Sequence, residues 1–382
     1  MTHRYVHAET LYDGSGAPAR HDCLVEVTGD RITAVTRAPT RLPSGTARVA
    51  IAAPGFIDLQ INGAADVQFN DDPSPVAIAR IAHGARAGGA AHVLPTFITA
   101  DGNGWHQALR AARDALNAHS PGVLGLHLEG PFLSPRRPGI HPAQAIRPLA
   151  EADLALLETA QIPLLLTLAP EEQPPGAIRR LASAGITVFA GHTAASAAQI
   201  DAAVAEGLRG VTHLWNAMPA PQGRAPGVVG RTLTHPTLFA GIIADGHHVD
   251  PLNLMLAARM MPNRLCLVTD AMRTYAGQVT EFDLMGTPVA LRDGRLTGPD
   301  GTLAGAHLGL DTALRLMVRS AGVPVEQAVA MASATPARVL RLEGELGRIA
   351  PGYRASLTHL NTDLHAIGGL VDGIPFEDLP TG

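Results

Sequence analysis

The sequence predicts an α/β protein, a (β/α)₈ barrel of the TIM type with a small β-sandwich domain formed from both chain termini. The first observation is that, from Pro54 onward, short apolar runs alternate with alanine-rich helical stretches, which is typical of βα units on a parallel sheet. The second is that the apolar runs number eight, as a closed barrel requires. No GxGxxG motif follows the first run, which counts against an open dinucleotide-binding sheet.

Composition narrows the class of protein. A chain of 382 residues is longer than one core usually supports, unless that core is a closed barrel with a small appendage. The net charge of −5 and the pI of about 6.4 indicate neither a nucleic-acid partner nor a membrane surface. Cys23 and Cys266 are too few for a disulfide framework or a cysteine zinc site, and they suggest a reducing compartment. With no signal peptide and no long apolar stretch, we expect a cytoplasmic protein.

The N-terminal segment is rich in β signals. Alternating runs at 4–7, 23–28 and 31–36 are separated by the turn sequences DGSG and GD, which predicts a small antiparallel sheet. The expected division is 1–53 for the N-terminal part of the β-sandwich, 54–343 for the barrel and 344–382 for the C-terminal part of the sandwich.

The barrel elements follow from the alternation of apolar and helical stretches. Strands are predicted at 56–61, 92–97, 123–128, 162–168, 187–190, 210–213, 239–244 and 265–269. Helices are predicted between them, among others at 75–87, 104–118, 172–184 and 194–206.

Beyond the eighth strand the pattern changes. Residues 279–296 alternate around the turn Asp293-Gly294, which predicts a β-hairpin inserted in a loop. Helices are expected at 308–320 and 324–340. The tail then has a turn at 347–352 and a strand at 355–360, which most simply rejoins the N-terminal sheet.

Polar residues follow the predicted strands, where a barrel of this kind has its active site. Glu129 ends the third strand, and burying its charge requires a cation or a proton. His192 and His213 follow the fifth and sixth strands. A lone histidine there is more often a satisfied core or surface group, but three coincident strand ends weaken that reading. One carboxylate and two imidazoles suit Zn²⁺ or Fe²⁺ with an open position for water.

Two aspartates lie at neighbouring strand ends. Asp270 follows the eighth strand and is the natural base, because a metal lowers the pKa of its bound water to about 7 and a carboxylate can take the proton. Asp58 on the first strand is equally well interpreted as an inward structural hydrogen-bond acceptor.

Several stretches resemble a known family. They are PGFIDLQING at 54–63, HLEGP at 127–131, GHT at 191–193, THLWNAM at 212–218, DGHHVD at 245–250, VTDA at 268–271 and TLAG at 302–305. Together they resemble the amidohydrolase superfamily and, within it, the N-acetylglucosamine-6-phosphate deacetylase family. The resemblance runs from about Asp30 to the tail, and it implies a barrel with a β-sandwich from both termini.

The resemblance implies roles for individual residues. Glu129, His192 and His213 would hold one divalent metal, Zn²⁺ or Fe²⁺, with Asp270 as general base and acid. His141 would be catalytic and substrate-binding, steadying the carbonyl oxygen as it becomes an oxyanion.

The superfamily often has His-x-His on the first strand, where this chain has Gln60 and Asn62. Amides are poor ligands for Zn²⁺ or Fe²⁺, so we predict a single metal, with Gln60 supporting the metal-bound water. Asn62 is a candidate for a supporting contact behind the ligands.

Substrate selection is also implied by the resemblance. Asn216 and the backbone of Ala217 would bind the phosphate, His248 the sugar ring or the phosphate, and Arg224 the phosphate through its planar guanidinium. In the family this arginine reaches in from a neighbouring subunit, so a homodimer is expected. Without the family, the Pro/Gly-rich surroundings of Arg224 would indicate plain surface loop.

The favoured function is metal-dependent hydrolysis of the acetamide of N-acetyl-D-glucosamine 6-phosphate to glucosamine 6-phosphate and acetate. The chain departs from the family pattern at 194–195, Arg273 and 306–307, which leaves the exact amino sugar open. Alternatives are another phosphorylated N-acetylhexosamine or an N-acyl amino acid as substrate. A non-catalytic barrel scaffold is the remote alternative, because neither the expected ligands nor Asp270 have been lost.

Overall fold

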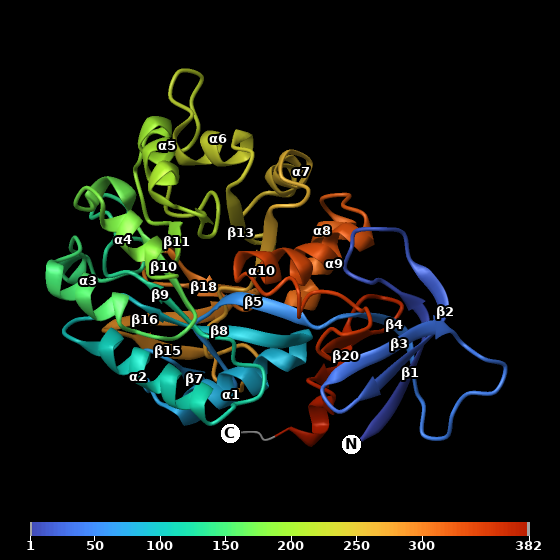
Figure 1. Ribbon diagram of the computed structural model, residues 1–382. Coiled ribbons are helices and arrows are strands. Elements are labelled where there is room, and N and C mark those ends of the chain that lie inside the picture. Colours follow the sequence, from blue (N-terminus) through green and yellow to red (C-terminus); the bar gives the residue numbers. More distant parts are fainter. Residues whose placement is uncertain (1, 380–382) are drawn as a thin grey trace.

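The centre of the molecule is a parallel sheet that curls into a near-barrel (Figure 1). The computed structural model describes residues 2–379. Eight strands follow one another in chain order: β5 (Phe56–Ile61), β8 (Ala90–Ile98), β9 (Leu126–Glu129), β10 (Leu164–Leu168), β11 (Thr187–Ala190), β12 (Gly210–Val211), β13 (Phe239–Ile243) and β14 (Leu265–Val268). Every neighbouring pair is parallel. The predicted fold class is confirmed.

The seam between β5 and β14 is closed mainly by residues beyond the end of β14. The backbone N–H of Asp270 donates to the carbonyl of Gln60 at 2.9 Å. The buried Asp58 carboxylate accepts from both the backbone N–H and the hydroxyl of Thr269. Burial raises the pKa of Asp58 to about 7. Asp58 therefore joins β5 to Thr269, the residue that precedes Asp270.

Ten α-helices are found in the described residues, most of them on the outside of the barrel (Figure 1). They are α1 (Pro75–Ala85), α2 (Gly104–Asn117), α3 (Glu151–Glu158), α4 (Ala177–Ser183), α5 (Ala197–Glu206), α6 (Gly227–Thr234), α7 (Pro251–Met260), α8 (Leu310–Arg319), α9 (Val325–Ala332) and α10 (Ala334–Val339). Short 3₁₀ turns are η1 (Arg86–Gly88), η2 (Ala143–Ala145), η3 (Pro170–Glu172) and η4 (Phe376–Asp378). Helices α3, α6 and α7 lie between barrel strands as expected, although no ranges were predicted for them.

Three predicted helices have different boundaries. The one expected at 172–184 begins only at α4, because two prolines and the left-handed Gly176 (φ 81°) precede it. The one at 194–206 begins at α5, where Ser196 and Gln199 form a capping box. The one at 324–340 is broken at Ser333 into α9 and α10, because Pro336 has no N–H to continue the helix.

The two chain ends share one seven-stranded sheet, at the right of Figure 1. Its order is β21 (Ile374–Pro375), β20 (Ala366–Val371), β19 (Leu357–Leu360), β4 (Ala47–Pro54), β1 (His3–Leu11), β2 (Arg20–Thr28) and β3 (Arg31–Arg37). The tail strand rejoins the N-terminal strands as predicted. The expectation of an antiparallel sheet was wrong in one respect: the unpredicted β4 pairs parallel with β1, so the sheet is mixed. The domain boundaries at 53/54 and 343/344 stay predictions.

The predicted hairpin at 279–296 is part of a larger unit. Strands β15 (Glu281–Leu284), β16 (Thr287–Arg292), β17 (Arg295–Thr297) and β18 (Leu303–Ala306) form an antiparallel sheet. A second small pair is β6 (Gly63–Ala64) with β7 (Val67–Gln68). The core of the four-stranded sheet includes Ile98 and Met272, which places the sheet over the carboxyl ends of the barrel strands. Among residues 2–379, no helix has the length and apolarity needed to cross a membrane.

Candidate active site

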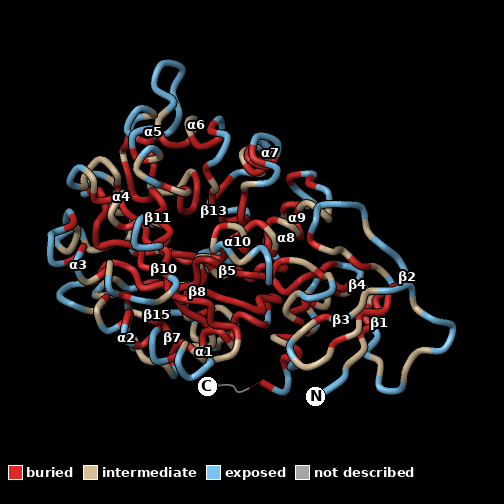
Figure 2. Tube along the Cα trace, in the orientation of Figure 1, coloured by how far each residue is buried: buried red, intermediate tan, exposed pale blue. Residues whose placement is uncertain are grey.

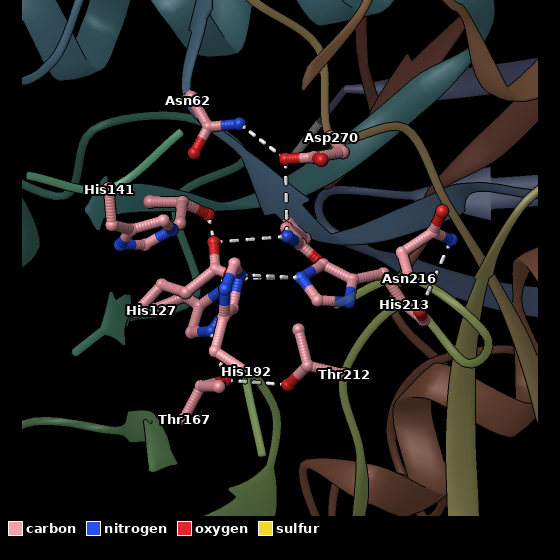
Figure 3. Close-up of polar contacts among 12 residues, drawn as sticks. Asn62, His127, His141, Thr167, His192, Thr212, His213, Asn216 and Asp270 are labelled. Carbon is pink, nitrogen blue, oxygen red and sulfur yellow. Dashed lines mark hydrogen bonds and ion pairs between the residues drawn. The ribbon is translucent and has the colours of Figure 1, made fainter. Parts of the chain in front are cut away.

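Three buried side chains converge at the carboxyl ends of the barrel strands. Glu129 ends β9, His192 lies two residues after β11 and His213 lies two residues after β12. Nε2 of His213 is 2.8 Å from Oε1 of Glu129, and Nε2 of His192 is 3.2 Å from the same oxygen. The two Nε2 atoms are 3.1 Å apart. Figure 3 shows the side chains of His192 and His213 pointing toward one another.

The backbone at these strand ends turns sharply. His192, His213 and Asp270 have φ values of 47°, 31° and 51°, in the left-handed region that side chains rarely adopt. Such residues concentrate where function constrains the backbone. A Cβ on Gly191 would lie 2.6 Å from Cγ2 of Thr167, so the residue before His192 has no room for a side chain. The turns direct the site residues into the mouth of the barrel.

The cluster has more hydrogen-bond acceptors than hydrogens to share. Nδ1–H of His192 donates to the carbonyl of Arg137 at 3.0 Å, which leaves a lone pair on its Nε2 in the neutral ring. Burial acts to lower the pKa of His213, but the hydrogen bond and charge of Glu129 raise it overall. One hydrogen on His213 cannot satisfy three mutual contacts. The donor set, one carboxylate oxygen and two imidazole nitrogens, therefore fits a divalent cation.

Asp270 lies beside the cluster and is held by two amides. The side-chain amide of Asn62 donates to its Oδ1 at 2.6 Å (Figure 3). The amide of Gln60 donates to the same oxygen at 3.1 Å. The Gln60 amide also donates to Oε2 of Glu129 at 3.2 Å, so it bridges the two carboxylates. Burial and the charge of Glu129 raise the pKa of Asp270 to about 6. The two amides at the His-x-His positions thus contact the carboxylates directly.

His141 lies over the same cluster. Its ring centroid is 4.2 Å from that of His192, and its Nδ1 is 2.9 Å from the hydroxyl of Thr99. Burial and the neighbouring His192 lower the pKa of His141 well below its usual value, so the ring is neutral. The structure therefore places His141 in the site, on the loop that follows Glu129 in the sequence.

His127, which precedes Glu129 by two residues on β9, points instead into the barrel interior. Its Nδ1 is 3.2 Å from the hydroxyl of Thr96, and its Nε2 is 2.8 Å from that of Thr167. Thr167 in turn contacts Thr212 at 2.6 Å (Figure 3). The His127 ring thus contacts threonine hydroxyls of the barrel interior rather than the three converging side chains.

A cavity of about 230 Å³ opens over these groups. It is lined by Ile98, Glu129, Gly139, Ile140, His141, His192, His213, Asn216, Ala217, His248, Asp270, Met272, Thr302, Leu303 and Gly305. Four of the expected substrate residues, His141, Asn216, Ala217 and His248, are among them. Nδ1 of His248 is 2.6 Å from Oδ2 of Asp245, a contact that fixes the orientation of the ring.

Arg224 does not line this cavity. It lies in a two-residue hairpin closed by backbone hydrogen bonds between Gln222 and Ala225 at 3.0 and 3.1 Å. The hairpin belongs to the exposed loop that projects beside α5 and α6 (Figures 1 and 2). Within residues 2–379, its guanidinium makes no hydrogen bond or ion pair. Arg224 thus lies on an exposed loop and is not among the residues that line the cavity of its own chain.

The sequence interpretation missed one wall of the cavity. Thr302, Leu303 and Gly305 reach it from the four-stranded sheet, and the quoted motif TLAG was the signal that could have identified them. Arg273, one of the departures from the family pattern, is not among the residues that line the cavity. Its guanidinium donates to the carbonyl of Asp66 and pairs with Asp71 at 3.0 Å.

Comparisons with known proteins agree with this geometry. The model of the amidohydrolase family matches residues 51–374. An N-acetylgalactosamine-6-phosphate deacetylase of Escherichia coli O157:H7 is 37% identical over 320 residues, covering 82% of this chain and 85% of the relative. An N-acetylglucosamine-6-phosphate deacetylase of Haemophilus influenzae is 32% identical over 323 residues, covering 84% of each chain.

A solved structure agrees over nearly the whole length. It is the N-acetylglucosamine-6-phosphate deacetylase of Pasteurella multocida, with a TM-score of 0.92 at 32% identity over 98% of this chain and 99% of that one. The chain therefore belongs to the amidohydrolase family, in the branch that holds the N-acetylglucosamine-6-phosphate and N-acetylgalactosamine-6-phosphate deacetylases.

Proposed function

We propose that this protein hydrolyses the acetamide of N-acetyl-D-glucosamine 6-phosphate, giving glucosamine 6-phosphate and acetate. The observation that carries the proposal is the buried convergence of Glu129, His192 and His213 beside Asp270 in one cavity. Membership of the deacetylase branch supports the coarser statement, that an N-acetylhexosamine 6-phosphate loses its acetyl group.

The three ligands would hold one divalent cation, Zn²⁺ or Fe²⁺, which when bound activates water and polarises the amide carbonyl. Asp270 takes the proton of the attacking water and returns it to the departing amine nitrogen. Because Gln60 and Asn62 donate to Oδ1, the second carboxylate oxygen is the one left for the proton. In this account Gln60 acts by orienting Asp270 and Glu129, whereas the sequence predicted support of the water itself.

His141 stabilises the carbonyl oxygen as negative charge develops on it. The Thr99 hydroxyl, 2.9 Å from Nδ1 of His141, fixes the orientation of the ring, and the same hydroxyl donates to the carbonyl of Glu129 at 3.2 Å. Thr99 therefore ties His141 to the strand end that carries Glu129.

Phosphate binding falls to Asn216, the backbone N–H of Ala217 and His248, which lie together along the cavity. We assign the remaining phosphate contact to Arg224 of a second copy of the chain, in a homodimer. The exposure of the hairpin supports this, and so does an exposed apolar stripe on the neighbouring α7. Leu252, Leu256 and Met260 lie four residues apart and are 70%, 43% and 43% exposed.

The first experiment is acetate release by metal-replete protein from N-acetylglucosamine 6-phosphate, beside the unphosphorylated sugar and a chelator-treated sample. We expect chelator-sensitive release from the phosphorylated sugar. Release from neither sugar by metal-replete protein would contradict the proposal.

N-acetylgalactosamine 6-phosphate is the second candidate, favoured by the 37% identical relative that carries that name. The two sugars differ only in the configuration at C4. The ratio of kcat/KM for the two compounds, measured on one preparation, decides between them.

The Arg224→Ala variant tests the phosphate site and the dimer together. Loss of a charged hydrogen-bond partner should lower kcat/KM for the phosphorylated sugar about 10- to 100-fold. The low activity expected on the unphosphorylated sugar should not change. Sedimentation velocity should show a dimer for both proteins, and a fully active wild-type monomer would contradict the shared site.

A further inference from the structure

A buried carboxylate outside the cavity contacts the loop that carries a metal ligand. Glu171 lies in η3 after β10, and its side chain is 2% exposed. It accepts from the hydroxyl of Thr193 at 2.5 Å and from the backbone N–H of Ala194 at 2.6 Å. These two donors directly follow His192.

The hydrogen bonds restrain a backbone that is otherwise unfavourable. His192 has φ 47°, a conformation that a histidine rarely adopts. The Thr193 hydroxyl also accepts from the N–H of Ala195 at 3.0 Å, so the turn after His192 is tied into one network that ends on Glu171. Without that acceptor, two buried donors would lose their partner and the turn would be free to relax.

Glu172, the next residue of η3, contacts a second loop that also bonds to His192. The hydroxyl of Ser134 donates to Glu172 at 2.7 Å, and the N–H of Ser134 donates to the carbonyl of His192 at 2.9 Å. A few residues on, the carbonyl of Arg137 accepts from Nδ1–H of His192 at 3.0 Å. The 3₁₀ turn η3 thus binds two loops that fix His192. One is the loop at 193–194, which follows His192, and the other is the loop at 134–137, which accepts from its ring.

A simple ion pair does not account for Glu171. The nearest cation is Arg136, whose side chain is 63% exposed and whose Nη2 is 3.7 Å from Oε1 of Glu171. Such an exposed pair contributes little. The direct partners of the carboxylate are the hydroxyl and the amide of the His192 loop.

We propose that Glu171 is a positioning residue of the metal centre, which holds His192 so that its Nε2 faces Glu129 and His213. The inference rests on the proposed function only in that these three residues bind a divalent cation. Removing the support of a metal-ligating histidine typically weakens metal binding about 10- to 100-fold.

The test measures the Zn²⁺ dissociation constant by competition with a chelating indicator, together with the Tm of the metal-free protein. Glu171→Ala should weaken Zn²⁺ binding about 10- to 100-fold. Glu171→Gln should retain binding near the wild-type value, because the amide oxygen still accepts from Ala194 and its N–H can donate to the Thr193 hydroxyl. The matched control is Asp153→Asn, which alters a buried carboxylate bonded to Arg147 and Ala150.

The control should lower the Tm and leave Zn²⁺ affinity unchanged. If Glu171→Ala binds Zn²⁺ like the wild type, or if the control loses affinity equally, the proposal is wrong. Failure of Glu171→Gln to retain binding would also overturn it. If Glu171→Ala does not fold, the Zn²⁺ affinities of Thr193→Val and Thr193→Ser are compared instead. Only the valine variant should bind Zn²⁺ more weakly, because serine keeps the hydroxyl that donates to Glu171. A wild type that binds Zn²⁺ but releases no acetate would refute the proposed function and leave this test intact.

Discussion

Strand β8 has a buried polar cluster near each of its ends. Near its start, His92 contacts the hydroxyl of Ser356 at 2.9 Å, and that hydroxyl contacts Asp372 at 3.3 Å. Arg354 binds both oxygens of Asp372. At its end, Ile98 lines the cavity over Glu129, His192 and His213. Both clusters combine histidine with a carboxylate.

The two clusters differ in their balance of donors and acceptors. In the His92 cluster, the Ser356 hydroxyl can accept from His92 and donate to Asp372, and the Arg354 guanidinium neutralises the carboxylate. In the cluster of Glu129, His192 and His213, no arginine within residues 2–379 is a partner of Glu129, and two imidazole nitrogens face each other. Burial of histidine with carboxylate is therefore not itself a sign of catalysis. The cluster of Glu129, His192 and His213 is distinguished by acceptors that face one another at hydrogen-bond distance.

The Glu129→Gln variant is the most direct test of whether these two clusters differ in metal binding. The amide removes the only anionic ligand, so we expect loss of stoichiometric metal and a fall of activity to background. Elemental analysis of the purified protein checks the metal, with one ion per chain expected for the wild type. A variant that keeps a full ion would show that Glu129 is not a ligand, and two ions per wild-type chain would contradict the single-metal prediction.

Asp270→Asn separates the metal from the proton transfer. We expect it to keep its metal and to lose about 10²- to 10⁴-fold in kcat, the usual contribution of a general base. In the wild type, activity should fall as the pH drops, because Asp270 must be ionised to take a proton. The acidic limb of the pH–activity profile should lie at or below pH 6, since Asp270 has a pKa of about 6 and the charge of a bound cation lowers that pKa further. Near-wild-type turnover of the variant would remove Asp270 from the mechanism.

The convergence of Glu129, His192 and His213 could be predicted from the sequence, because all (β/α)₈ barrels bring the ends of their strands together at one face. Parallel barrel strands bring their carboxyl ends together, so Glu129, His192 and His213 could be grouped once the strands had been recognised. The order of the strands followed from the same alternation of apolar and helical stretches. Helix α7 has a start signal in the sequence as well, since Asp250 caps it and Pro251 is its first residue.

Contacts between distant segments could not be predicted in this way. Leu303 reaches the cavity only because the four-stranded sheet packs on Ile98 and Met272. Glu171 contacts the His192 loop because neighbouring barrel strands end at similar heights, a register that the sequence pattern does not specify. His92 meets Ser356 across 264 residues of chain. Such pairs depend on tertiary packing, which local propensity and periodicity do not encode.

The smallest expected effect concerns the His92 cluster, and it appears in stability. Burial lowers the pKa of His92 from 6.5 to about 4, so the folded protein keeps this ring neutral while the unfolded chain protonates it. Below pH 6.5 the unfolded state therefore binds more protons, and the free energy of unfolding falls as the pH drops toward 4. The contribution of this one group is about 3 kcal/mol over that range.

His92→Gln removes the titrating ring but keeps an N–H that can donate to Ser356. Between pH 7 and 4.5, we expect the free energy of unfolding to fall by about 2 to 3 kcal/mol less in the variant than in the wild type. Urea unfolding at the two pH values measures this, and the other histidines cancel because both proteins have them. Zn²⁺ affinity at pH 7 should be the same in both proteins. An equal fall in both would show that His92 is not held neutral, and loss of Zn²⁺ by the variant would show that the two ends of β8 are coupled.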